Sequence, residues 1–327
     1  MHVSATPEQT VRLAALAASH APSILNTQPW RFHGDGSGIE IHADPRRQLR
    51  HADPDGREMM ISCGAAAFNA WLALRALGYS ATITTRHGPG QDPPAVRISW
   101  HRLLAPATSE LALHRQVAIR RSYRGGFLSR PVPRWLAGGL RGAAGLEGAC
   151  LEVARDSQRA ASVAAAVRVG ETTLRLDRGR SREQARWATP PGSPRRDGVP
   201  PAAYPAAPAR TSPEFGFRDF SRGRAWGSLT QRADGPVTDA GLVCVLTTPA
   251  DRPEDWVRAG LALQRTLLTA AVGGASASPH SQPLEFPDLR GFVHRRLCDG
   301  YPQLILRVGF TTVRGASVRR PLAVTLA

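Results

Sequence analysis

The run from Met59 to Leu74 contains no charged residue, and it constrains the fold more than any other stretch of the chain. Its 16 residues would form an α-helix about 24 Å long at about 1.5 Å per residue. A bilayer core needs about 30 Å of apolar helix, so the run is too short to cross a membrane. We therefore expect a helix over about 57–77, ended by Gly78 and buried by other elements of the protein.

The segments around this helix mix helical periods with short β-rich runs. The amino-terminal helix begins at Pro7, because Thr6 and Gln9 form a capping box, and it continues to about Ser19. Regular β-α-β alternation is absent from the pattern, which indicates an α+β fold. Further helices are expected near 109–120, from 133, 157–176, 253–272 (started by Asp251) and 287–297; strands near 30–33, 39–42, 80–86, 95–102, 150–154, 242–248 and 303–310; and loops at 21–29 and 274–283.

The length of 327 residues suits two domains, or one domain built from two similar halves. Similar elements reappear after residue 105, so the halves are expected at 1–105 and 106–327. Residues 178–236 hold 9 of the 27 prolines and little periodicity, which predicts an excursion outside the core. The excursion is either a disordered linker or an ordered lid over a site, and its aromatic residues favour the lid: Tyr204, Phe215, Phe217, Phe220 and Trp226.

The basic residues are all arginine, because the chain contains no lysine, and the formal net charge is +16. This excludes a lysine Schiff base, the Walker A phosphate loop and the kinase lysine. The arginines are spread along the chain without a nucleic-acid-binding motif, so we expect no nucleic-acid partner. Where arginines cluster, an anionic small ligand such as a phosphate is the better interpretation.

The four cysteines lie far apart, without a C-x-x-C pair or a histidine at metal-ligand spacing. They are expected to be reduced, buried thiols in a cytoplasmic protein without a metal site: Cys63, Cys150, Cys244 and Cys298. The amino terminus shows no secretory pattern, and no membrane association is expected.

Two clusters carry chemistry. The first, Pro22 to Trp30, is a loop dense in hydroxyl and amide groups, which can hydrogen-bond the polar edge of a planar heterocycle. The second, Arg120 to Arg124, places guanidinium groups and a hydroxyl within two helical turns, which suits a phosphate monoester. The arginine cluster alone is equally consistent with a solvated basic surface.

Together the clusters resemble the two sequence hallmarks of the FMN-dependent nitroreductase family. These are A-P-S-x-x-N-x-Q-P-W at 21–30 and R-R-S-x-R at 120–124, followed by Pro131-Val132-Pro133. Ordinary members carry both motifs in one short chain, in the opposite order, and bind the flavin at a homodimer interface. Here each half keeps one motif, which resembles the Acg subfamily: fused pseudo-dimers that are monomers with a lid over the cofactor. Further matches are 55–58, 62–65, 195–200 and 302–304.

The resemblance implies the roles of particular residues toward FMN. The flavin ring would contact Pro22, Ser23 and Asn26, in a loop that also presents Ile24, Leu25 and Gln28. The phosphate would be bound by Arg120 and Ser122 with Arg121 nearby, and completed by Arg319 and Arg320. Arg124 would lie beside flavin N1 and O2, and Ser278, in the loop at 276–282, near the reactive face. The simpler interpretation of His20 and His280 is that they are ordinary polar residues. On the long helix, the packing seam between the halves is expected to include Phe68, Trp71 and Leu74.

Two functions stay open at this point. The first is an FMN-dependent oxidoreductase that passes a hydride from NAD(P)H to a nitroaromatic, a quinone or a similar acceptor. The flavin would carry the chemistry, so no catalytic side chain is required. The second is a flavin-sequestering protein whose lid seals the cofactor and prevents turnover.

Overall fold

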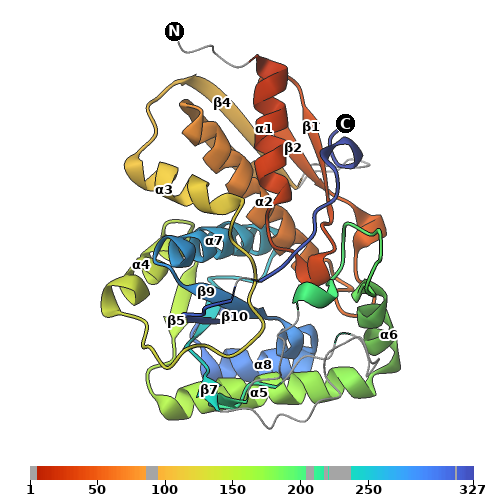
Figure 1. Ribbon diagram of the computed structural model, residues 1–327, viewed down its shortest axis with the longest axis vertical. Helices are drawn as coiled ribbons and strands as arrows, with labels where there is room; N and C mark the ends of the chain where they lie inside the picture. Colours follow the sequence, from red (N-terminus) through yellow and green to blue (C-terminus); the bar gives the residue numbers. More distant parts are fainter. Residues whose placement is uncertain (1–5, 86–94, 204–209, 217–219, 221–236, 314) are drawn as a thin grey trace.

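The computed structural model describes residues 6–85, 95–203, 210–216, 220, 237–313 and 315–327. Its first sheet is antiparallel with strand order β1-β2-β4-β3, where β1 is Trp30–Gly34, β2 Gly38–Ala43, β3 Tyr79–Thr85 and β4 Val96–Leu103. Helices α1 (Pro7–Ser19) and α2 (Arg57–Ala76) pack against one another and against this sheet (Figure 1). As predicted, Thr6 and Gln9 form the capping box that begins α1.

The second sheet is also antiparallel, with order β5-β8-β10-β9. Its strands are β5 (Cys150–Val153), β8 (Leu242–Thr248), β9 (Ser276–His280) and β10 (Tyr301–Gly309). The helices of this part of the chain are α3 (Thr108–Val117), α4 (Arg134–Gly145), α5 (Ser157–Leu176), α6 (Arg178–Trp187), α7 (Pro253–Val272) and α8 (Pro287–Leu297). The mixture of helices with antiparallel sheets is the predicted α+β class.

The two sheets have the same topology. In each, the first strand pairs with the second, the second with the fourth, and the fourth with the third. A 20-residue helix joins the second strand to the third in both, α2 in one and α7 in the other. The second sheet differs by a long insertion, 154–241, between its first two strands. This repeat supports the interpretation of two similar halves.

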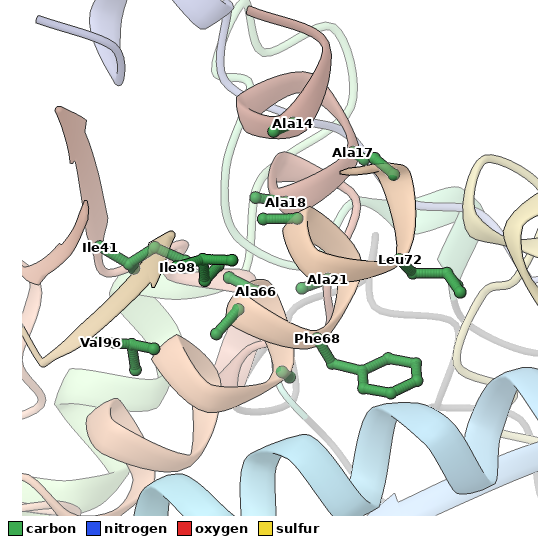
Figure 2. Packing of buried hydrophobic residues seen from close by; sticks show 14 of the residues in the cluster. Ala14, Ala17, Ala18, Ala21, Ile41, Ala66, Phe68, Leu72, Val96 and Ile98 are labelled. Carbon is green, nitrogen blue, oxygen red and sulfur yellow. The ribbon is translucent and has the colours of Figure 1, made fainter. Parts of the chain in front are cut away.

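Helices α2 and α7 form the seam between the sheets. Gly64 and Gly260 let the two backbones touch, since a Cβ on Gly260 would lie 2.1 Å from the Ile61 carbonyl oxygen. A buried hydrogen bond of 2.7 Å joins Gln264 Nε2 to Asn69 Oδ1 beside this crossing. Figure 2 shows Phe68 pointing from α2 toward α7, where the Arg265 guanidinium lies 4.7 Å from its ring centre.

The prediction of a buried helix is confirmed for α2. Among the described residues it is the one helix long and apolar enough to span a membrane, yet 78% of its apolar window is buried inside the protein. Leu74 lies wholly within the first core, and the Arg265 guanidinium covers the Trp71 ring as well as that of Phe68.

Several predicted elements are corrected by the structure. Residues 276–280 form strand β9 instead of a loop; Pro279 is tolerated there because β9 is an edge strand. Residues 178–187, expected outside regular structure, form α6, which Asp177 caps at the Arg180 amide. Helix α7 is capped at Arg252, because the Asp251 carboxylate accepts from Trp256 and Arg290 instead.

The cysteine prediction holds for three of the four residues. Cys63, Cys244 and Cys298 are buried, but Cys150 is exposed, because it begins the edge strand β5.

The carboxy-terminal tail returns to the first sheet. It leaves β10 and runs up beside β1 (Figure 1), where the Phe32 amide donates to the Thr325 carbonyl and the Ala327 amide donates to the Phe32 carbonyl. Leu322 and Leu326 pack on the first core. The tail therefore ties the end of the chain to β1 and to the core of the first half.

Candidate functional site

The loop between α1 and β1 has an unusual backbone. Leu25, Asn26 and Gln28 have φ of 45°, 55° and 49°, in the left-handed region that residues other than glycine rarely adopt. Such residues persist only where the surroundings hold them, and they cluster at functional sites. Ser23 is one such support, since its Oγ accepts from the Gln28 amide at 2.9 Å.

Asn26 joins three segments at the centre of this loop. Its Nδ2 donates to the Gly198 carbonyl (2.9 Å) and the Val318 carbonyl (3.1 Å), and its Oδ1 accepts from Arg319 Nη1 (3.0 Å). The Asn26 amide group is thus occupied by protein partners. It holds the loop, the excursion and the carboxy-terminal tail together.

A small pocket of about 340 Å³ lies where these segments meet; we call it the arginine pocket. Arg120 and Arg319 line it, together with Ser122, Arg124 and Ser317. Arg120 is 6% exposed and donates from Nη2 to the His20 carbonyl, while its Nε and Nη1 have no partner among the described residues. Burial, with Arg121 and Arg124 nearby, lowers the pKa of Arg120 to about 9.

Arg319 shares this environment. Its Nη1 and Nη2 donate to Asn26, to the Ser317 hydroxyl and to the backbone carbonyls of Val318, His20 and Ala21, whereas its Nε is buried without a partner among the described residues. Burial and the other guanidinium groups hold its pKa well below the ordinary value. A buried cation beside a half-buried one favours binding of an anion.

A larger cavity of about 890 Å³, its mouth included, continues from the arginine pocket; we call it the central pocket. The two share Pro22, Ser23, Ser122 and Arg124. The central pocket's apolar lining comes from both halves: Leu25, Ile61, Leu174, Phe220, Leu263 and Leu304. Long, largely apolar and cationic at one end, the pair of pockets can hold a planar heterocycle that carries a phosphate.

Strand β9 positions the R-R-S-x-R segment along the pocket. The Tyr123 amide donates to the Ala277 carbonyl at 2.9 Å, and Ser122 forms a parallel bridge with the same residue. The segment therefore extends the second sheet past its edge. This places Ser122 and Arg124 in the lining of both pockets.

The described part of the excursion closes over the loop. The Gly198 amide donates to the Asn26 carbonyl, and Gln28 Nε2 donates to the Arg196 carbonyl at 2.9 Å. Phe220 and Val199 pack with Leu25. Asp197 pairs with Arg47 and Arg195, whose guanidinium groups both lie over the Trp187 ring. The aromatic residues Tyr204, Phe217 and Trp226 lie outside the described residues.

Two carboxyl groups line the central pocket, Glu58 and Glu285. Burial raises the pKa of Glu58, although Arg57 pairs with it. Burial, assisted by the Glu58 charge, raises the pKa of Glu285 to about 8. Ser281 Oγ donates to Glu285 Oε1 at 2.9 Å. This side of the pocket therefore holds a carboxyl group that is protonated near neutral pH.

Nine of the thirteen residues singled out from the sequence line the two pockets: Pro22, Ser23, Ile24, Leu25, Asn26, Arg120, Ser122, Arg124 and Arg319. The other four are not among the described lining residues. Gln28 is held between the Arg196 carbonyl and the Arg320 amide. The Arg320 guanidinium donates to the carbonyls of Gln28 and Val324, and that of Arg121 to the carbonyls of Ala118 and Arg120.

Ser278 faces away from the central pocket. Strand alternation gives the pocket Pro279 and Ser281, while Ser278 and His280 turn to the opposite side and meet the buried Arg307. Because 276–280 is a strand, Ser278 is not among the described residues that line the central pocket, whereas Pro279 and Ser281 are. His20 contributes its carbonyl oxygen, which accepts from Arg120 and Arg319.

Sequence reasoning missed the acidic and polar side of the central pocket. Glu58, Ser62, Arg180, Gln282 and Glu285 line it, from α2, α6 and the turn after β9. Glu58 and Ser62 stand in the matched segments of the long helix, which was a usable signal. No local pattern marks Glu285. Among the described residues, no group of three or more His, Cys, Asp or Glu side chains is placed to hold a metal ion.

No family model matches the chain. Two proteins of Mycobacterium tuberculosis strain ATCC 25618 / H37Rv have names that begin "Putative NAD(P)H nitroreductase". The first is 32% identical over 308 residues, which cover 93% of this chain and 86% of that protein. The second, acg, is 26% identical over 326 residues, or 95% of this chain and 93% of that protein.

Solved structures are similar at lower identity. The FMN and NADPH-dependent nitroreductase NfnB from sphigopyxis sp. strain HMH is 20% identical, with a TM-score of 0.39 over 68% of this chain and 98% of that one. The FMN-dependent nitroreductase NfnB from Mycobacterium smegmatis, in complex with NADPH, is 16% identical, with a TM-score of 0.39 over 66% and 96%.

Proposed function

The chain belongs to the NAD(P)H nitroreductase family, and from that premise we propose that it is an FMN-dependent oxidoreductase. NAD(P)H would be the electron donor, and a nitroaromatic, a quinone or a similar small molecule the acceptor. The flavin would supply the redox chemistry, taking a hydride from the nicotinamide and passing it on.

The observation that carries this proposal is the unsatisfied guanidinium of Arg120. A buried charge with two donor nitrogens lacking a described partner is costly, unless an anion binds there. Arg319 adds a second, half-buried cation, and the hydroxyls of Ser122 and Ser317 add neutral donors. A phosphate dianion accepts several such hydrogen bonds, so this donor set fits the FMN phosphate.

The central pocket fits the flavin ring. Its apolar side chains suit a planar aromatic system, and Pro22, Ser23 and Ile24 of the loop line the same pocket. Arg124 lines both pockets and supplies a permanent cation between them. A cation beside the ring favours the added negative charge of the reduced flavin.

We further propose that the two halves are a fused pseudo-dimer with a single flavin site. Residues 22–26 come from the first half, residues 120–124 from the second, and Arg319 from the tail. The protein would act as a cytoplasmic monomer on small molecules, without a nucleic-acid or membrane partner. Residues 188–203 and Phe220, packed on the loop, support the interpretation of the excursion as a lid.

The test is a spectrum followed by an anaerobic reduction. Purified protein should carry the visible absorption of bound FMN, and excess NADPH or NADH should bleach that band within seconds. Addition of a quinone or nitroaromatic should then restore the band. A flavin band that neither nicotinamide bleaches would contradict reductase function and favour the sequestration hypothesis, which the relatives' names do not support.

A further inference from the structure

Glu285 stands between the central pocket and a second cavity. That cavity, which we call the outer pocket, measures about 1000 Å³ with its open mouth included and lies on the other side of Glu285. Glu285 and Arg180 line both pockets. The outer pocket also contains Asp53, Asp55 and His294. A carboxyl group in this position contacts the reaction space on one side and ionisable groups on the other.

The groups that face Glu285 favour its neutral form. Glu58 from α2 and Glu171 from α5 are acidic, and both oppose a negative charge on Glu285. Arg57 from α2 is the opposing cation, but it pairs with Glu58 and donates to the Gln303 carbonyl. From α6, Arg180 pairs with Asp177 and donates to the backbone carbonyl of Glu285. Within the described part of the chain, the hydrogen bond to the carboxyl group itself comes from the Ser281 hydroxyl.

The reaction of the proposed function requires a proton as well as a hydride. A quinone becomes a hydroquinone by gaining one hydride equivalent and one proton. Hydride transfer alone leaves an oxyanion in a largely apolar cavity, where a negative charge is costly. A neutral acid that lines the same cavity removes this cost by protonating the oxygen as the charge develops.

We propose that Glu285 is the catalytic acid that protonates the acceptor, an inference that rests on the proposed function. The Glu285 O–H bond breaks as an O–H bond forms on the acceptor oxygen, while the hydride equivalent comes from the nicotinamide by way of the bound flavin. The carboxylate left behind regains a proton from water through the outer pocket. Each turnover thus consumes one NAD(P)H and one proton from solvent. The sequence alone had suggested that no side-chain acid was needed.

The test isolates the second half of the reaction. Flavin in the purified holoprotein is reduced anaerobically with dithionite and mixed in a stopped-flow instrument with 1,4-benzoquinone across neutral and alkaline pH. For the wild-type protein, the flavin reoxidation rate should fall as pH rises through about 8, where the acid loses its proton. Glu285→Gln should be slower at neutral pH by about 100-fold or more and should lack this pH step.

Two variants and a second readout complete the test. Glu285→Asp should recover part of the rate, and Glu214→Gln, a surface carboxylate paired with Arg168, should behave as wild type. Infrared spectra of the resting protein should show a protonated-carboxyl band at neutral pH that Glu285→Gln lacks. Wild-type rates and pH profile in Glu285→Gln, or a Glu285 that is ionised at neutral pH, would overturn the proposal. Dithionite supplies the electrons, so failure of the nicotinamide step would count against the proposed function alone.

Discussion

At the scale of single residues, Arg120 differs from the arginines of this chain that pair with a carboxylate. Arg75, Arg97 and Arg265 each pair with a carboxylate, whereas Arg120 faces other cations within the described residues. Its guanidinium is therefore held in an environment that an anionic ligand would stabilise. The free energy of that stabilisation is part of the binding energy for FMN.

Substitution of Arg120 by alanine should weaken FMN binding by about 10- to 100-fold. A hydrogen bond to a charged group contributes about 1.5–3 kcal/mol, and about 1.4 kcal/mol corresponds to a factor of ten. The dissociation constant can be measured by fluorescence titration of apoprotein with FMN. Arg121→Ala serves as the control, because its guanidinium binds backbone carbonyls outside the pocket. Equal losses in both variants would contradict the assignment.

Glu285 should also impose a pH dependence on stability. Its pKa is raised from 4.5 to about 8 in the fold. For a raised pKa, the stabilisation is complete below the unfolded value near 4.5 and is lost as pH rises through about 8. The free energy of unfolding of Glu285→Gln, relative to wild type, should therefore increase between these two pH values and then level off. Chemical denaturation of both apoproteins at several pH values would measure this; a constant difference would contradict the raised pKa.

The local sequence predicted which segments form the site better than it predicted which side chains point into the pocket. The two motifs identified Ser23, Arg120 and Ser122 because each motif lies in one continuous segment. Arg319 and Arg320 are adjacent in sequence, yet only Arg319 turns into the arginine pocket. Arg320 is turned away from the pocket because it bonds Gln28, which is more than 290 residues distant in the sequence. Local sequence does not indicate such a contact.

At the scale of elements, the two long helices determine how the halves meet. The close approach of α2 and α7 leaves no room for a side chain at Gly64 or Gly260. Both glycines look like weak points of a helix when each segment is considered alone. Their role becomes visible only when the two helices are placed together.

Gly260→Ala should destabilise the protein by about 1–3 kcal/mol or more, because the added methyl group would meet rigid backbone at 2.1 Å. The control is Gly142→Ala in α4, where a Cβ would meet nothing within 4 Å. That change should stabilise the protein by about 0.5–1 kcal/mol, since alanine is the better helix former. Urea denaturation of both variants tests the pair. An unchanged free energy of unfolding in Gly260→Ala would show that the two helices can move apart without cost.

A second contact at the scale of elements holds the excursion that we propose as a lid, the pairing of Asp197 with Arg47 and Arg195. Arg47 also donates from Nε to the Thr27 carbonyl at 2.6 Å, so the pair fixes the excursion against the loop between α1 and β1. Gly198 (φ 76°) follows in the left-handed region, and a Cβ there would lie 2.4 Å from the Trp187 carbonyl oxygen.

Asp197→Asn should speed FMN release by about tenfold, because loss of one partner of a largely buried charged pair costs about 1–3 kcal/mol. Hydrogen exchange at the Gly198 amide, which donates to the Asn26 carbonyl, should accelerate in parallel. The matched control is again Glu214→Gln, whose partner Arg168 is exposed. Unchanged amide exchange in Asp197→Asn would show that this contact does not hold the lid.

Sequence periodicity predicted most elements, and its failures have physical causes. It located α5, α8 and β8 because each has a clear apolar pattern and a recognisable start. It missed β9, since Pro279 is a strand breaker everywhere except at an edge. It missed α6 because that helix is almost entirely polar and is held by Asp177 and Glu183, the latter accepting from the amides of His51 and Ala52.

At the scale of the whole molecule, the repeated strand order explains the incomplete motifs. Two similar sheets are joined by α2 and α7, and the described pockets that line up with the motifs draw on both halves and on the tail. Both motifs of the proposed flavin site therefore line pockets within a single chain. The sequence predicted two halves from the reappearance of similar elements, but the return of the tail to β1 is a long-range contact without a local signal.

The protein should therefore be a monomer that binds one FMN. Light scattering coupled to size exclusion should give a mass near 35.1 kDa, and flavin released on denaturation should equal one per chain. The physical reason is that residues 22–26 and 120–124 converge within one chain and already provide both sides of the site. Arg120→Ala should lower the flavin content without changing the mass, since its guanidinium lies inside the pocket. A dimer with one flavin per two chains would instead place the complete site between subunits and contradict the fused pseudo-dimer.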